Sequence, residues 1–181
     1  MEKKVVALTG MPGSGKSLVA KVAMEMGFSI VVMGDVIREE TERRGLKITS
    51  ENMGAVMLKL REEYGAAVIA KRCVSKIKTG TSSKVLVDGV RGFPEVDEFR
   101  KHFPNFILLA VHSSPGTRFQ RLYRRQRSDD PQSWEEFVER DLRELQVGVG
   151  AAIALADHML VNEATPTQFR RAAEDLLRKV I

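Results

Sequence analysis

A short glycine-rich segment near the amino terminus constrains the fold of this chain more than any other feature. Residues 10–17 read Gly-Met-Pro-Gly-Ser-Gly-Lys-Ser, with an apolar run over residues 5–9 before them and a helix-forming segment over residues 17–26 after them. This is the G-x-x-x-x-G-K-S spacing, in which a turn between a buried strand and a helix surrounds a phosphate with backbone N–H groups. A glycine-rich turn with an incidental lysine is the competing interpretation, and the strand-then-helix context argues against it.

The segment predicts a binding site for ATP and Mg²⁺. The positive end of the following helix favours phosphate groups, Lys16 can reach the β- and γ-phosphates, and the Ser17 hydroxyl can bind Mg²⁺. The predicted nucleotide-binding residues are Gly10, Met11, Pro12, Gly13, Ser14, Gly15, Lys16, Ser17 and Leu18.

The bulk properties indicate a single soluble domain covering residues 1–181. The chain carries a formal net charge of +5 and one cysteine, Cys73, which is predicted to be a small core residue on a helix. No apolar run reaches the roughly 18 residues that a bilayer span needs. Residues 1–4 lead directly into a strand, without a signal-peptide pattern. We therefore expect a cytoplasmic protein with no membrane partner.

The apolar runs predict an α/β architecture. After the first strand, further strands are expected over residues 28–33, 85–87, 106–111 and 158–161, each separated from the next by helical patterns. Such alternation is typical of a doubly wound, mostly parallel sheet, with its active crevice at the carboxyl ends of the strands.

The segment between the second and third strands is predicted to be helical. Asp35 is expected to cap a helix over residues 36–44, and Thr49 or Ser50 a second helix. The apolar stripe on this second helix is assigned to the core because helical spacing alone more often marks core than ligand surface. Its members are Met53, Val56, Met57 and Leu60.

An acidic residue follows the third predicted strand directly. If that strand neighbours the phosphate-loop strand, Asp88 can hold Mg²⁺ directly or through water. A turn-forming Asp-Gly pair is the alternative, and the phosphate loop upstream favours the metal site. Arg91, three residues further on, is expected to face the same crevice.

A helix beginning near residue 115 carries a series of arginines. Arg118, Arg121 and Arg125 are spaced three and four apart and share one face, whereas Arg124 turns away. Like charges stacked on one face repel, and a bound polyphosphate would relieve that repulsion through charge-assisted hydrogen bonds. A solvated, salt-bridged surface face is the alternative.

The whole chain resembles P-loop proteins of the nucleoside-monophosphate-kinase type. Residues 34–38 (Gly-Asp-Val-Ile-Arg) are similar to the adenylate kinase motif whose arginine binds the acceptor phosphate, and residues 88–91 (Asp-Gly-Val-Arg) look like a shortened D-G-F-P-R motif. Residues 156–162 resemble the A-D-x-x-[IL]-x-N pattern of dephospho-CoA kinase. The overall likeness is greatest to archaeal adenylate-kinase-related proteins that combine these features.

The resemblance implies a three-layer P-loop NTPase fold, with a five-stranded parallel sheet of order 2-3-1-4-5 and helices on both faces. It implies a helical acceptor-binding insertion at residues 35–80 and a short lid at residues 126–145. The lid lacks the four-cysteine cluster of the long-lid adenylate kinases. The remaining core comprises residues 1–34, 81–125 and 146–181.

The resemblance also assigns roles to charged residues. Arg121 and Arg125 match lid-proximal arginines around the donor phosphates, and Arg140 matches the arginine that bridges donor and acceptor. The motif at residues 88–91 lacks the proline and brings its arginine one place closer. The predicted catalytic residues are Lys16, Arg121, Arg125, Arg140 and Asp35, the acceptor-binding residues are Asp35, Arg38 and Arg91, and the Mg²⁺ ligands are Ser17 and Asp88.

The predicted activity is ATP- and Mg²⁺-dependent transfer of the γ-phosphate to a phosphorylated small-molecule acceptor, first of all an AMP-like nucleoside monophosphate. One alternative is a metabolite kinase similar to dephospho-CoA kinase, and another is an ATPase switch acting on a protein or RNA partner. Direct nucleic-acid binding by the arginine-rich helix is less favoured, because aromatic residues make up only 6% of the chain and base stacking depends on them.

Overall fold

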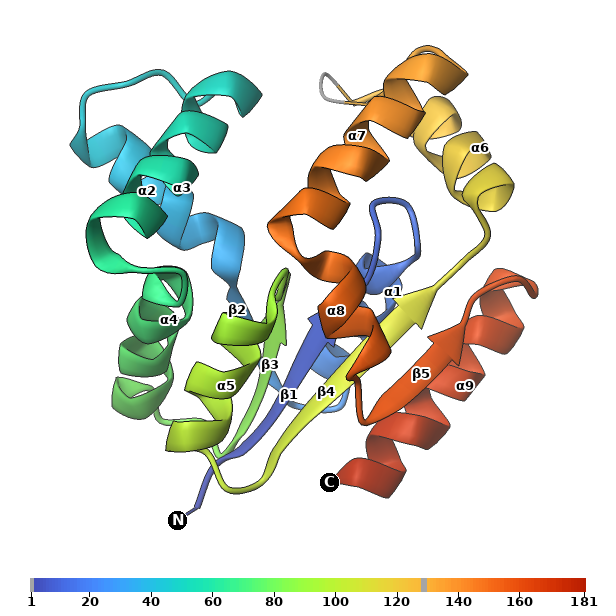
Figure 1. Ribbon diagram of the computed structural model, residues 1–181. Helices are drawn as coiled ribbons and strands as arrows, with labels where there is room; N and C mark the ends of the chain where they lie inside the picture. The colour runs from blue at the N-terminus through green and yellow to red at the C-terminus, as the bar shows by residue number, and fades with distance from the viewer. Residues whose placement is uncertain (1, 128–129) are drawn as a thin grey trace.

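The computed structural model describes residues 2–127 and 130–181; positions 128 and 129 of the predicted lid lie outside the described residues. Strands and helices alternate along the chain (Figure 1). The strands are β1 (Lys4–Thr9), β2 (Ser29–Val32), β3 (Lys84–Asp88), β4 (Phe106–His112) and β5 (His158–Val161). The helices are α1 (Lys16–Glu25), α2 (Met33–Arg43), α3 (Ser50–Tyr64), α4 (Val68–Thr79), α5 (Phe93–His102), α6 (Pro115–Arg125), α7 (Trp134–Val147), α8 (Val149–Ala154) and α9 (Pro166–Val180).

The strands form one five-stranded parallel sheet in the order β2-β3-β1-β4-β5. β1 is the central strand, and its Ala7 lies in register with Val87 of β3 and Leu108 of β4. The strand order and the three-layer kinase fold that the sequence predicted are therefore confirmed.

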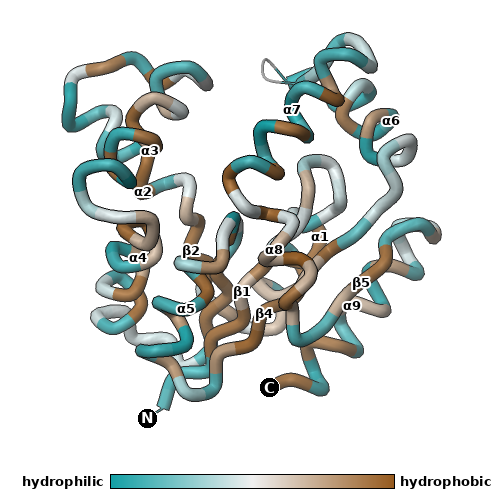
Figure 2. Tube along the Cα trace, viewed as in Figure 1, coloured by the Kyte–Doolittle hydropathy of each residue, from teal (hydrophilic) through white to brown (hydrophobic). Residues whose placement is uncertain are grey.

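Both faces of the sheet are buried, which explains why its strands read as continuous apolar runs rather than alternating ones. Val5 and Ala7 face a cluster that includes residues of α4 and α5, whereas Val6 and Leu8 face a second cluster with α1 and α9. Figure 2 shows hydrophobic residues along the central strands and more hydrophilic ones on the outer helices. The buried sheet fixes the carboxyl ends of β1 and β3 side by side.

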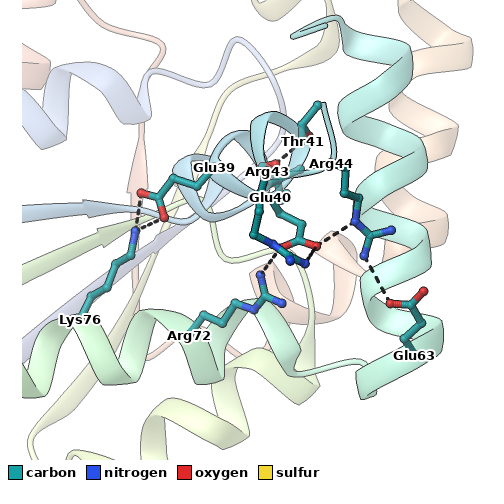
Figure 3. Close-up of polar contacts among 9 residues, drawn as sticks. Glu39, Glu40, Thr41, Arg43, Arg44, Glu63, Arg72 and Lys76 are labelled. Atoms are coloured by element: carbon teal, nitrogen blue, oxygen red, sulfur yellow. Dashed lines mark hydrogen bonds and ion pairs between the residues drawn. The ribbon is translucent and has the colours of Figure 1, made fainter. Parts of the chain in front are cut away.

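Polar contacts centred on the buried carboxylate of Glu40 connect the helices α2, α3 and α4 (Figure 3). Glu40 of α2 accepts hydrogen bonds from Arg43 of its own helix, from Arg44 at the C-terminal end of that helix and from Arg72 of α4, at 2.7 to 3.0 Å. Arg44 also reaches Glu63 of α3 at 3.3 Å. The hydrogen bonds from Arg43, with smaller contributions from the other arginines, hold the pKa of Glu40 far below its ordinary value. The carboxylate therefore stays charged and links α2 to α4, while Arg44 extends the contacts to α3.

Two local predictions in this region need correction. α2 begins at Met33, so Asp35 lies in its first turn and is not its N-cap. Met33 is buried in the apolar cluster around α4, and the helix begins three residues earlier than the predicted start at residue 36. Of the predicted core stripe on α3, Val56 and Leu60 are buried, but Met57 lines a cavity described below.

Candidate active site

The phosphate loop joins β1 to α1 in a conformation that requires glycine. Gly10 has a φ of 144° and Gly15 a φ of 109°, in the region that side-chain-bearing residues avoid. A Cβ atom on Gly10 would lie 2.3 Å from the carbonyl oxygen of Val111, and one on Gly15 would lie 2.2 Å from Nδ2 of Asn162. The loop is therefore pressed against the ends of β4 and β5.

Several backbone donors of the loop are available to an anion. Within residues 2–127 and 130–181, we find no acceptor for the N–H groups of Gly13, Gly15, Lys16 and Ser17. They lie in the turn before α1 and in its first residues, where the helix dipole adds partial positive charge. This arrangement fits the phosphate chain of a nucleotide.

The Lys16 ammonium lies over the loop. Its Nζ donates to the carbonyl oxygens of Gly10, at 2.6 Å, and Met11, at 3.1 Å. Burial lowers the pKa of Lys16 to about 8, although the nearby carboxylate of Asp88 raises it. A phosphate in the loop would compete with these two carbonyls for the ammonium group.

A cavity of about 380 Å³ lies in front of the loop, and most of the charged residues that line it are cationic. It brings together the phosphate loop, the end of β3, and the helices α6 and α7, which are distant in the sequence. Such a charge distribution fits a polyphosphate. The predicted site residues that line it are Gly10, Pro12, Gly13, Gly15, Lys16, Ser17, Asp88, Arg91, Arg121, Arg125 and Arg140.

Three predicted loop residues do not line this cavity. Met11 contributes its carbonyl to Lys16, and Leu18 packs against the apolar cluster under α1. Ser14 is buried, and its hydroxyl has no partner among the described residues. The carbonyl oxygen of Ser14 instead accepts hydrogen bonds from Asn162, at 2.9 Å, and Ser113, at 3.2 Å.

Asp88, a predicted Mg²⁺ ligand, lies beside the phosphate loop, and its metal-binding role stays a prediction. It ends β3 in register with Leu8 of β1, beside the phosphate loop, and it lines the cavity with Ser17. Burial raises the pKa of Asp88, and Lys16 and Arg91 oppose that shift. One carboxylate and one hydroxyl suit Mg²⁺, which takes few protein ligands when phosphates supply others. The described residues contain no larger cluster of metal-binding side chains.

The arginines of α6 have different surroundings. Arg118 is buried and forms a bidentate pair with Asp141 of α7, with N–O distances of 2.8 and 2.5 Å. The like-charge argument therefore does not apply to Arg118, because its charge is balanced. Arg121 lines the cavity and donates to the Ser113 hydroxyl and the Asn162 carbonyl, at 2.8 and 2.9 Å.

The two remaining predicted lid arginines share a carboxylate. Arg125 donates to both oxygens of Asp130, at 2.9 and 2.5 Å, and Arg140 lies 3.6 Å from the same side chain. The Arg125 hydrogen bond, more than the other contacts, lowers the pKa of Asp130. Asp130 therefore fixes two cavity-lining arginines from α6 and α7 relative to each other.

The structure does not bring Asp35 and Arg38 into the cavity. They pair with each other along α2 at 2.5 Å, and both side chains are about half exposed. Their proposed roles at the acceptor stay predictions. Arg91 does line the cavity, and its Nη1 lies 3.3 Å from Glu144 of α7.

A second cavity, of about 230 Å³, lies between α2, α3 and the loop after β3. It shares Lys16, Asp88, Gly89 and Arg91 with the first cavity, so the two meet beside the phosphate loop. Its other lining residues are Val32, Met33, Gly34, Ile37, Met57, Arg61, Ile69 and Glu95.

Sequence reasoning assigned no role to several residues that shape the site. Asn162 and Ser113 support the phosphate loop from the ends of β5 and β4, and Glu144 lines the first cavity. For Asn162, the pattern at residues 156–162 was the available signal. Glu144 has no comparable signal, because its partner Arg91 is remote in the sequence.

Together, the parallel sheet, the phosphate loop and the cation-lined cavity define a P-loop NTP-binding domain with a kinase-like fold. Residues 9–138 match a family model described as an AAA domain. The chain belongs to the UPF0200 family. It is 48% identical to a UPF0200 protein of Pyrococcus abyssi, over 98% of this chain and 97% of that protein. It is 49% identical to one of Hyperthermus butylicus, over 97% and 94% of the two chains.

Solved structures share the fold at low sequence identity. TT1252 from Thermus thermophilus superposes with a TM-score of 0.70 and 20% identity, covering 100% of both chains. A shikimate kinase from Acinetobacter baumannii gives a TM-score of 0.63 and 16% identity, over 98% of this chain and 93% of that one. A gluconokinase from Sinorhizobium meliloti gives 0.60 and 14%, with the same coverage. Within the described ranges, none of the helices has the length and hydropathy that a bilayer span requires.

Proposed function

We propose that this protein is a phosphotransferase that moves the γ-phosphate of ATP to a small acceptor that itself carries a phosphate. The nucleoside-monophosphate-kinase resemblance favours an AMP-like nucleotide as the acceptor. Solved structures that share this fold include a shikimate kinase and a gluconokinase, which act on small molecules.

One observation carries the proposal. The first cavity, in front of the phosphate loop, and the second cavity meet at Lys16, Asp88, Gly89 and Arg91. Phosphoryl transfer needs two anions held in line, with the charge of the transferred group neutralised between them. A site with two compartments and two cations at their junction meets that need, whereas simple hydrolysis does not require the second compartment.

Different residues of the chain would bind the donor, the metal ion and the acceptor. The loop N–H groups and Lys16 bind the donor phosphates, while Arg121, Arg125 and Arg140 stabilise charge on the transferred group. Ser17 and Asp88 would hold Mg²⁺, which supplies further charge neutralisation when bound. Arg91 would bind the acceptor phosphate, and closure of α6 and α7 over the site would exclude water as a competing acceptor.

The first test replaces Lys16 with alanine. We expect loss of ATP turnover in an assay that couples ADP release to ATP with a panel of nucleoside monophosphates and dephospho-CoA. Lys21→Ala is the matched control, because Lys21 is an exposed lysine on the same helix. Unchanged turnover in Lys16→Ala would refute the assignment of the phosphate loop.

The second test replaces Arg91 with alanine. We expect the KM for the acceptor to rise far more than the KM for ATP, because Arg91 lines both cavities but is assigned to the acceptor. Equal changes in both constants would contradict that assignment. Phosphate release without any acceptor, and without acceleration by the panel, would favour the ATPase alternative.

A further inference from the structure

The second cavity contains a buried ion pair that the proposed catalytic steps do not use. Arg61 of α3 donates from Nη2 to Oε1 of Glu95 at 2.8 Å. Glu95 is only 2% exposed, and its other oxygen accepts the backbone N–H of Arg91 at 2.8 Å. Glu95 therefore connects the second cavity to the loop at the junction of the two cavities.

The guanidinium of Arg61 keeps donors available to a ligand. Among the residues that the structure describes, we find one hydrogen bond from this side chain, and a guanidinium has five N–H groups. Arg118 differs, because it is buried and bonded to Asp141, Ser113 and Pro12. Arg118 is thus engaged by the protein, whereas Arg61 lines a cavity.

The remaining walls of the second cavity are mostly apolar. Met33 and Ile37 of α2, Met57 of α3 and Ile69 of α4 lie around it. A compact, largely apolar pocket with a few placed polar groups is the usual form of a small-molecule site. A ligand with an anionic group and a small carbon skeleton would match both Arg61 and the apolar residues of this cavity.

The helices that form this pocket are connected by the polar contacts in Figure 3. Arg72 of α4 bonds to Glu40 of α2, and Arg44, at the C-terminal end of α2, bonds to Glu63 of α3. Because α2, α3 and α4 are fixed in this way, the pocket is preformed and its ligand does not have to assemble it.

We propose that Arg61 is a second acceptor-recognition residue of this protein, in addition to Arg91. It binds an anionic group of a compact acceptor, a phosphate or a carboxylate, within the cavity that Lys16, Asp88 and Arg91 also line. Glu95 is a positioning residue, which holds Arg61 and the backbone of Arg91 in place. The inference rests on the proposed function, because it places an acceptor in the second cavity.

The test measures ligand binding by calorimetry on the full chain. The phosphate loop is first filled with Mg²⁺ and the non-hydrolysable analogue AMP-PNP, and this titration is recorded on its own. AMP and inorganic phosphate then test binding of a phosphate group, and 3-hydroxybutyrate tests binding of a carboxylate. Adenosine is the uncharged control for AMP. We expect at least one anion to bind the wild type more tightly than adenosine.

Arg61→Met should weaken the binding of that anion by about tenfold or more, the range expected for the loss of a charge-assisted hydrogen bond. Arg61→Lys should retain part of the affinity. Lys59→Met is the matched control, because Lys59 carries the same charge on the same helix and its side chain is 62% exposed. It should bind all ligands as the wild type does.

Arg61→Met leaves the Glu95 carboxylate buried without its partner, so this variant can fail to fold for structural reasons. The double variant Arg61→Met with Glu95→Gln removes both charges together. We expect it to bind AMP-PNP normally and still lack anion binding.

Two results would overturn the inference: no anion binds the wild type once AMP-PNP is bound, or the double variant binds the anion as the wild type does. Failure of the wild type to bind AMP-PNP in the first titration would instead refute the proposed function, and this inference with it.

Discussion

Replacing Asp141 with asparagine would remove the counter-charge of a buried arginine. Arg118 lies against both oxygens of Asp141, at 2.8 and 2.5 Å, and its Cζ lies 4.8 Å from the centre of the Phe137 ring. Its other hydrogen bonds go to the carbonyl oxygens of Ser113 and Pro12, both at 3.2 Å. The Arg118 side chain is only 4% exposed, so these contacts take the place of water around its guanidinium.

The expected loss follows from the burial of this pair. Removing one partner of a buried ion pair costs about 3–5 kcal/mol in the free energy of unfolding, because the remaining charge is left uncompensated. For a chain of this length, each kcal/mol lowers Tm by about 2–4 °C, so Asp141→Asn should melt roughly 6–20 °C below the wild type. The pair joins α6 to α7, and so its loss should also loosen the predicted lid.

The assay is urea unfolding followed by circular dichroism, with a thermal melt on the same samples. The double variant Arg118→Met with Asp141→Leu should recover much of the loss, because neither charge is then buried alone. Asp97→Asn is the control, since the Asp97–Lys101 pair is largely exposed and its loss should leave the free energy of unfolding almost unchanged. The reasoning is wrong if the free energy of unfolding of Asp141→Asn lies within about 1 kcal/mol of the wild-type value. It is also wrong if the double variant is no more stable than the single one.

Three further predictions concern the phosphate loop and the core. Gly15→Ala should weaken AMP-PNP binding strongly, measured by calorimetry, because the new Cβ would overlap Asn162. Gly27→Ala is the control: Gly27 has a φ of 84° and no atom within 4 Å of an added Cβ, so nucleotide affinity should be unchanged. Nucleotide affinity should be highest below pH 8 and fall as the pH rises through the Lys16 pKa of about 8, since phosphate binding favours the protonated ammonium. A flat affinity profile between pH 7.5 and pH 9.5 would contradict that role for Lys16. Cys73 is buried and burial raises its pKa to about 12, so its thiol should react with a thiol reagent only after unfolding; rapid labelling of the native protein would contradict this.

The positions of the strands and of the phosphate loop could be predicted from the sequence because their signals are local, whereas the strand order followed from the family resemblance. An apolar run buried on both faces marks a parallel strand, and the spacing of Gly10, Gly15 and Lys16 fixes the turn that follows it. The position of Asp88 also follows locally, since a residue that ends a parallel strand lies at the same edge as the loop. These predictions needed no knowledge of contacts between distant residues.

The roles of individual arginines could not be predicted in the same way. Arg118 and Arg121 share a helix face, yet one is balanced by Asp141 and the other lines the cavity, and Asp141 is 23 residues away. Arg61 and Glu95 are 34 residues apart. Helical spacing predicts which face of a helix is buried, but not whether that face meets core or cavity, and Met57 was misassigned for this reason.

The support that Asn162 gives the phosphate loop has a consequence for how the protein matures. The side-chain amide holds the carbonyl of Ser14, 148 positions earlier in the chain, and Ser113 reaches the same carbonyl. During synthesis, the loop is made first but receives this support only after β5 has emerged and paired with β4. A nascent chain should therefore gain tight nucleotide binding late and abruptly, when its fifth strand is added, rather than in step with its growing length.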